Sequence, residues 1–119
     1  MLLRFSKTAR LTRSAEYQRL KREGVSIHGK FMVLSVIKHS TSRETRAGII
    51  TSRRVGGAVV RNRVRRRMRE LLRADRPRFE RGLWLVLIAR QRAANASFDE
   101  LRTEWRHLAE RGAVLRSEP

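Results

Sequence analysis

The fold is decided by one stretch of the chain, residues 53–72, with the sequence RRVGGAVVRNRVRRRMRELL. Six of the nine residues from Arg61 to Arg69 are arginine. The apolar residues inside the stretch nevertheless keep helical spacing: Val60, Val64, Met68, Leu71 and Leu72. At the α-helical step of about 100° per residue they form one stripe roughly 120° wide. The pattern predicts an amphipathic helix over about 58–74 whose apolar stripe seals a core.

Another face of this helix, at roughly 140° to 240° on the same wheel, carries Asn62, Arg65, Arg66 and Arg69. An ordinary solvated face mixes acids with bases, but the first acid after Arg53 is Glu70. Like charges at helical spacing repel, so this crowding costs stability unless a polyanion neutralises it. We therefore interpret the face as a binding surface for a polyanion.

The composition of the whole chain supports this interpretation. With 29 Lys and Arg against 11 Asp and Glu in 119 residues, the net charge is +18, which favours nucleic acid as a partner over an anionic membrane. The chain has no cysteine, which excludes disulfides and thiolate chemistry and suits a reducing cytoplasm. No apolar run approaches a membrane span, so we expect a cytoplasmic protein without a membrane partner.

The remaining patterns predict the order of the other elements. They indicate a helix over about 15–23, a turn or short edge strand over 25–29, strands over 31–37, 45–52 and 83–89, and a loop over 90–96. Strands 31–37 and 83–89 are apolar on both faces, which is typical of central strands. We expect 31–37 and 45–52 to pair as an antiparallel hairpin.

The last helix begins at a capping box, Ser97 with Glu100, and ends near Gly112. The resulting order, α-β-β-β-α-β-α, predicts an α/β two-layer sandwich with one mixed sheet. We assign residues 1–13 to a basic N-terminal arm, 14–112 to a single RNA-binding domain and 113–119 to a tail.

No pattern indicates catalytic or metal-binding residues on the protein. The histidines, His28, His39 and His107, are dispersed, and metal sites need convergent ligands. Gly56 and Gly57 precede a helix but no Gly-Lys-Ser/Thr follows, so they do not form a P-loop. What remains suits RNA: an amide in an arginine run, and Tyr17 as a platform for an unpaired base. A core tyrosine with its hydroxyl in water explains Tyr17 equally well.

These residues resemble the protein component of bacterial ribonuclease P. The family signature reads aliphatic, two of any type, Ala, two of any type, Arg-Asn-basic-aliphatic-basic-Arg, one of any type, aliphatic and basic. Every position is filled here by Val55, Ala58, Arg61-Asn62-Arg63-Val64-Arg65-Arg66, Met68 and Arg69. The resemblance covers about residues 10–108 and includes the turn from Ser52 to Gly56.

The resemblance implies the protein subunit of an endonuclease, a hydrolase that removes the 5′ leader from precursor tRNA. Hydrolysis would be performed by the RNA subunit with Mg²⁺, held mainly by that RNA, so the protein alone should be inactive and need no obligate protein partner. The RNA subunit would be contacted by Arg61, Asn62, Arg63, Arg65, Arg66 and Arg69. The family also has a left-handed strand–helix–strand crossover, against the general rule.

The resemblance further implies a cleft between the first helix and the sheet that holds the single-stranded leader. The matching positions are Tyr17, Lys21, Val33, Ser35, Arg53 and Arg54. Lys21 stands where family members usually carry a second aromatic residue. A phosphate contact would there replace a stacking contact, which leaves the preferred leader sequence open.

Two other classes of protein fit the same charge. A ribosomal-type structural RNA-binding protein or an RNA chaperone would show no preference for a leader. A DNA-binding protein with this helix in the major groove ranks last, because the chain has neither dimerisation heptads nor helix-turn-helix spacing.

Overall fold

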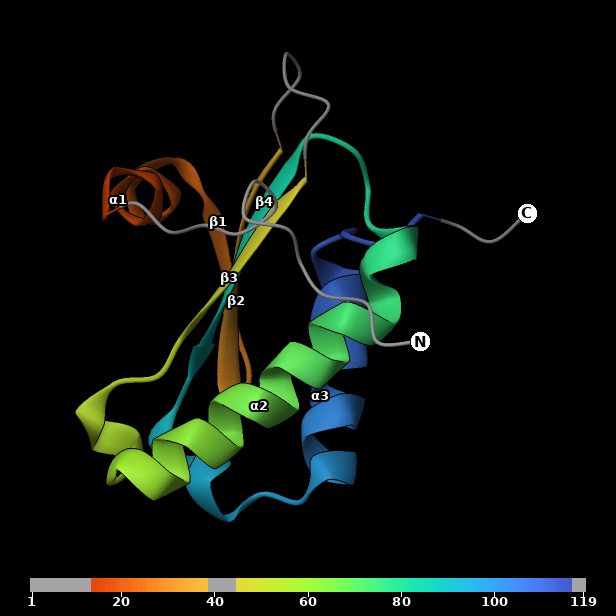
Figure 1. The fold of residues 1–119 in the computed structure, drawn as a ribbon. Helices are drawn as coiled ribbons and strands as arrows, with labels where there is room; N and C mark the ends of the chain where they lie inside the picture. The colour runs from red at the N-terminus through yellow and green to blue at the C-terminus, as the bar shows by residue number, and fades with distance from the viewer. Residues whose placement is uncertain (1–13, 39–44, 117–119) are drawn as a thin grey trace.

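The computed structural model describes residues 14–38 and 45–116, with side chains from residue 18 onward. The helices are α1 (Ser14–Glu23), α2 (Ala58–Asp75) and α3 (Phe98–Arg111), and the strands are β1 (Val25–His28), β2 (Met32–Lys38), β3 (Arg46–Ile50) and β4 (Leu83–Ala89). Three short 3₁₀ helices are η2 (Arg53–Val55), η3 (Arg76–Arg78) and η4 (Gln91–Asn95). The predicted element order is confirmed (Figure 1). The predicted arm over 1–13 lies outside the described residues, as do residues 39–44.

The four strands form one mixed sheet in the order β1-β2-β4-β3. The two runs that are apolar on both faces, β2 and β4, are its inner strands, as predicted. β4 pairs antiparallel with β2 and parallel with β3, and α2 connects β3 to β4. The left-handed course of this connection stays a prediction.

The predicted hairpin between residues 31–37 and 45–52 is wrong. β4 lies between these two strands, and β2 instead forms its hairpin with β1, placing Val25 opposite Val36. The physical reason is burial, because β4 is apolar on both faces and an inner position places it beneath the helices on either side of the sheet. β3 consequently occupies an edge of the sheet.

Helices α2 and α3 cover one face of the sheet, and α1 lies on the other face (Figure 1). The main core joins one side of the strands to the two helices through Met32, Leu34, Leu85, Leu87, Val64, Met68, Leu72, Leu101, Trp105 and Leu108. The predicted apolar stripe of α2 is therefore confirmed. On the opposite face Leu20 of α1 packs with Val86, while Ile50 and Ile88 are only partly covered. The two-layer sandwich thus carries α1 as a partial cover over its second face.

The predicted starts of α2 and α3 have clear local causes. Gly56 has a φ of 151°, a backbone conformation that residues other than glycine rarely adopt. This conformation allows the sharp turn into α2. The capping box of α3 is confirmed, since Glu100 N donates to Ser97 Oγ at 3.1 Å and Ser97 N donates to Glu100 Oε1 at 2.9 Å. Hydrogen bonds from the backbone and then the side chain of Ser97 hold the pKa of Glu100 below its ordinary value.

The packed part of the chain continues beyond residue 112, where the sequence predicted a tail. Val114 is fully buried and its carbonyl accepts a hydrogen bond from Glu80 N at 2.8 Å. Leu115 forms an antiparallel bridge with Phe79. Two apolar residues after a helix are too short a pattern to indicate this docking, which depends on a partner about 35 positions earlier.

A single carboxylate joins α3 to the turn between β1 and β2. Glu104 Oε2 accepts hydrogen bonds from Phe31 N at 2.8 Å and Met32 N at 2.9 Å, and Oε1 accepts one from Lys30 N at 2.5 Å. A Cβ added at Gly29 would lie 2.5 Å from the carboxyl carbon of Glu104, so the glycine makes room for this contact. The Glu104 carboxylate, which we call the Glu104 clip, thus provides an acceptor for three backbone N–H groups where β2 begins.

We expect Glu104→Ala to lower the free energy of unfolding by about 2–4 kcal/mol, because it leaves these backbone donors without an acceptor. Glu110→Ala, at an exposed position of the same helix, should change it by less than about 0.5 kcal/mol. Urea unfolding of both variants measures the difference. Equal stability of the two variants would show that water replaces the carboxylate at no cost.

Candidate RNA interface

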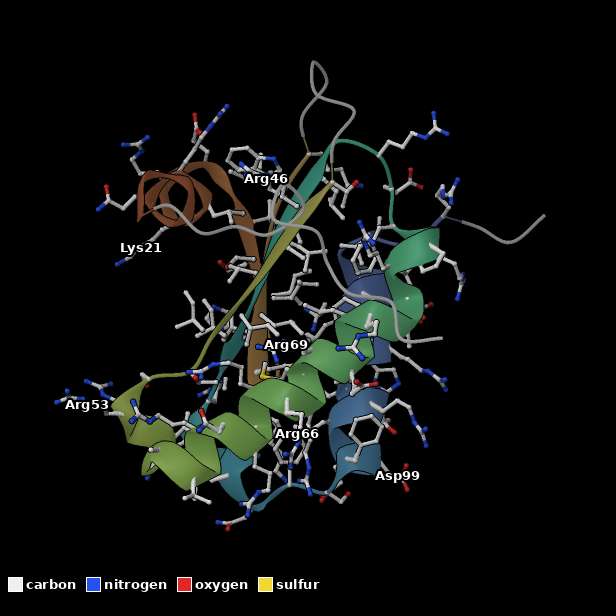
Figure 2. The ribbon with its side chains drawn as sticks, in the orientation of Figure 1. Lys21, Arg46, Arg53, Arg66, Arg69 and Asp99 are labelled. Carbon is white, nitrogen blue, oxygen red and sulfur yellow. The ribbon has the colours of Figure 1, made fainter. Side chains whose placement is uncertain are left out.

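The outer face of α2 presents an arginine surface made of Asn62, Arg65, Arg66 and Arg69. Asn62, Arg66 and Arg69 are exposed, and Arg65 is half-buried (Figure 2 shows Arg66 and Arg69 on α2). Arg65 donates to Thr51 Oγ1 at 2.6 Å and to Asn62 Oδ1 at 3.1 Å, which orients its guanidinium without neutralising it. Within the described ranges none of these three arginines is ion-paired with a carboxylate. Their charge therefore remains available for an outside anion.

Two other arginines of α2 have a different role. Arg63 Nη2 donates to Ala94 O at 2.9 Å, and Arg67 Nη1 donates to Ala96 O at 2.9 Å. Both bonds fasten the η4 segment, predicted as a plain loop, against the helix. Arg63 was predicted as an RNA contact, but at least one arm of its guanidinium is committed to the protein. Sequence reasoning missed this division because backbone carbonyls as acceptors leave no mark in the sequence.

Arg53 and Arg54 extend the charged surface beyond the end of α2. Both are exposed on η2, which follows the end of β3 and leads through Gly57 into the first turn of α2. η2 also packs against η4, which follows the end of the parallel strand β4. Figure 2 shows Arg53 projecting away from the sheet at this end of the molecule. The surface that begins on α2 thus continues around one end of the sheet.

A separate groove of about 460 Å³ lies on the opposite face of the sheet, beside α1. It is lined by Gln18, Leu20, Lys21, Ser26, His28, Val33, Ser35, Ile50, Val86 and Ile88. Its floor is mostly aliphatic, with one polar spot where the hydroxyl oxygens of Ser26 and Ser35 lie 2.8 Å apart. This groove lies where the family resemblance implied a cleft, between the first helix and the sheet.

The structure brings together half of the predicted leader-binding residues in this groove. Lys21, Val33 and Ser35 all line it. Arg53 and Arg54 do not line it. They lie beyond the end of the groove where Ile50, the last residue of β3, and Ile88, near the end of β4, are located. Tyr17 belongs to α1, and its side chain lies outside the described part of the chain.

The carboxylates of the described residues do not converge on a metal site. No group of three or more His, Asp or Glu side chains there could hold a metal ion. Several carboxylates are committed elsewhere: Asp75 accepts from Trp105 Nε1 at 2.7 Å, and Glu70 pairs with Arg73 at 2.8 Å. These residues therefore do not fit a Mg²⁺ ion held by the protein alone. Separately, the described helices include none that could cross a membrane.

Comparison with known proteins identifies the family of this chain. The family model for ribonuclease P matches residues 5–112, which is most of the chain. The chain belongs to this family. A ribonuclease P protein component from Symbiobacterium thermophilum is 38% identical over 94% of this chain and 97% of its own length. That from Roseiflexus castenholzii is 37% identical over 89% of this chain and 87% of its own length.

Solved structures of the ribonuclease P family show the same fold. The ribonuclease P protein from Staphylococcus aureus superposes with a TM-score of 0.83 at 25% identity, covering 100% of this chain and 99% of that one. The protein from Thermotoga maritima gives a TM-score of 0.74 at 25% identity, covering 86% of this chain and 96% of that one. The recognition from the signature residues is thereby confirmed, together with the fold class.

Proposed function

We propose that this chain is the binding subunit of ribonuclease P, in which the RNA subunit carries the catalytic groups. Membership of the family carries the coarser statement: the chain is a ribonuclease P protein component that binds RNA and takes part in tRNA processing together with the ribonuclease P RNA. The observation that supports the finer division is the presence of two distinct surfaces, one cationic and one groove-shaped, on opposite faces of a single sheet.

The arginine surface of α2 is the site we assign to the RNA subunit. Arginine forms planar, two-pronged hydrogen bonds with phosphate and stays charged at any physiological pH. Arg66 and Arg69 reach solvent directly, and Arg65 is held in place by Thr51 and Asn62. Arg61 and Arg63 flank this set as half-buried residues, so their contribution to RNA binding is smaller.

The groove is the site we assign to the single-stranded 5′ leader of precursor tRNA. Its aliphatic floor contacts the faces of unpaired bases, and the hydroxyl pair of Ser26 and Ser35 offers both donor and acceptor to a base edge. Lys21 supplies a positive charge at the rim, where it contacts phosphate instead of stacking on a base. Binding the leader here keeps the precursor on the enzyme without any chemistry by the protein.

Mg²⁺ belongs with the RNA subunit in this proposal. No carboxylates converge among residues 18–38 and 45–116, and the arginines offset repulsion between the phosphates of enzyme and substrate, a task that high Mg²⁺ otherwise performs. We place the complex in the cytoplasm, because a chain without cysteine needs no oxidising compartment.

Reconstitution with the cognate RNA subunit tests this function. We expect no cleavage of precursor tRNA by the protein alone, and a rate at low Mg²⁺ that rises at least about tenfold when protein is added to the RNA. We also expect the assembled enzyme to bind precursor tRNA more tightly than mature tRNA. A protein that binds both equally and does not stimulate the RNA would instead be a structural RNA-binding protein.

A further inference from the structure

Three side chains from three elements form a stacked cluster on the groove face of the sheet. The guanidinium carbon of Arg19, on α1, and that of Arg46, on β3, each lie 5.6 Å from the ring centroid of Trp84, on β4. Arg46 and Trp84 are direct partners in the parallel pairing of β3 with β4. We call these three residues the Trp84 cluster. At this distance a guanidinium is attracted to the electron-rich face of the indole.

The Trp84 cluster continues the floor of the groove. Every second residue of β4, namely Trp84, Val86 and Ile88, lies on this face of the sheet. Trp84 packs in one apolar cluster with Leu20 and Val86, which line the groove. Ile88 lies four positions after Trp84 along the strand, a distance of about 13 Å. Figure 2 shows Arg46 and Arg53 at opposite ends of the sheet. The groove therefore has arginines beyond both of its ends.

The chemistry of the cluster suits a nucleic-acid backbone. A guanidinium stacked on an aromatic ring keeps its edge N–H groups directed outward, where they match the oxygens of a phosphate. The indole holds the guanidinium groups of Arg19 and Arg46 near one another, and Glu23 pairs with Arg19 at 2.6 Å at the surface, where such a pair is weak. Among the described side chains that line the groove only His28 carries a ring, and Trp84 adds an indole that packs next to them on this face.

Resting on the proposed function, we propose that the Trp84 cluster is a distal contact for the phosphate backbone of the leader. The RNA subunit, which performs hydrolysis, binds at the α2 and η2 end of the molecule. Nucleotides next to the cleaved bond then lie at the Arg53 end of the groove. Nucleotides farther toward the 5′ end cross the groove floor and reach Arg46 and Arg19, which Trp84 positions.

The test measures the affinity of the reconstituted holoenzyme for precursor tRNAs whose leaders are lengthened one nucleotide at a time. We expect the wild-type affinity to rise in two steps, first as the leader fills the groove and again as it reaches the cluster. Arg46→Gln should remove the second step, an effect of about three- to tenfold, and lower the dependence of log affinity on log salt by about 0.7 for the long leader only. Trp84→Leu, which keeps apolar bulk, should remove the same step.

Arg111→Gln is the matched control, because it removes one positive charge from an exposed position on α3. It should leave both steps in place. If Arg46→Gln behaves like Arg111→Gln, or if the cluster variants weaken all leader lengths equally, the distal contact is wrong while leader binding stands. If leader length has no effect even on the wild type, the proposed function itself fails. Should Trp84→Leu unfold, Arg46→Gln and Arg19→Gln carry the test.

Discussion

Replacing Arg66 and Arg69 together by alanine should lower the affinity for the RNA subunit by about 100-fold, because each proposed charge-assisted hydrogen bond would contribute about 1.5 kcal/mol. Both side chains are exposed on α2 and neither pairs with a carboxylate in the described part of the chain. Thermal stability should stay unchanged or rise, because the double substitution relieves like-charge repulsion. Filter binding over a range of salt concentrations should show the log–log slope reduced by about 1.5.

The same helix supplies the matched control. Arg63→Ala with Arg67→Ala removes the same charge, but these side chains donate to Ala94 O and Ala96 O. We expect this pair to lower the free energy of unfolding by about 2–4 kcal/mol, since two carbonyls lose charged donors. Measured below its melting temperature, the Arg63/Arg67 variant should lose less affinity for the RNA subunit than the Arg66/Arg69 variant. If both pairs affected RNA binding and stability alike, the division of the arginines into two groups would be incorrect.

Replacing Val64 by aspartate has the largest expected effect on stability. Val64 has 0% exposure and packs in the core between α2 and the sheet. An unpaired carboxylate at such a site costs several kcal/mol, which is comparable to the whole stability of a typical domain at about 5–15 kcal/mol. We expect the variant to lose its cooperative urea transition and much of its far-ultraviolet circular dichroism.

Val59→Asp on the same helix is the comparison. Val59 is 80% exposed in the first turn, so its replacement should be neutral or slightly stabilising through the helix dipole. A folded Val64→Asp protein with stability near that of Val59→Asp would mean that the apolar stripe of α2 is not what attaches this helix to the sheet.

The sequence by itself determined which segments form helices and strands and which face of α2 is apolar. These features follow from periodicity and end signals that are written in neighbouring residues, such as the stripe from Val60 to Leu72 and the capping box of Ser97. The segregation of charge on α2 also predicted which side of the helix is exposed and cationic, and RNA binding by that side stays a prediction. The family signature, which lies within the same helix, was enough to identify ribonuclease P.

Tertiary structure alone decided which strand lies beside β4, which arginines of α2 bind the protein and where the chain after α3 docks. The placement of β4 between β2 and β3, the bonds from Arg63 and Arg67, and the clip made by Glu104 all join residues far apart in the sequence. Periodicity shows which side of a helix or strand is buried, but it does not show which other segment packs against that side. The choice of partner depends on the competition among all buried surfaces of the chain, and it exists only once the chain has folded.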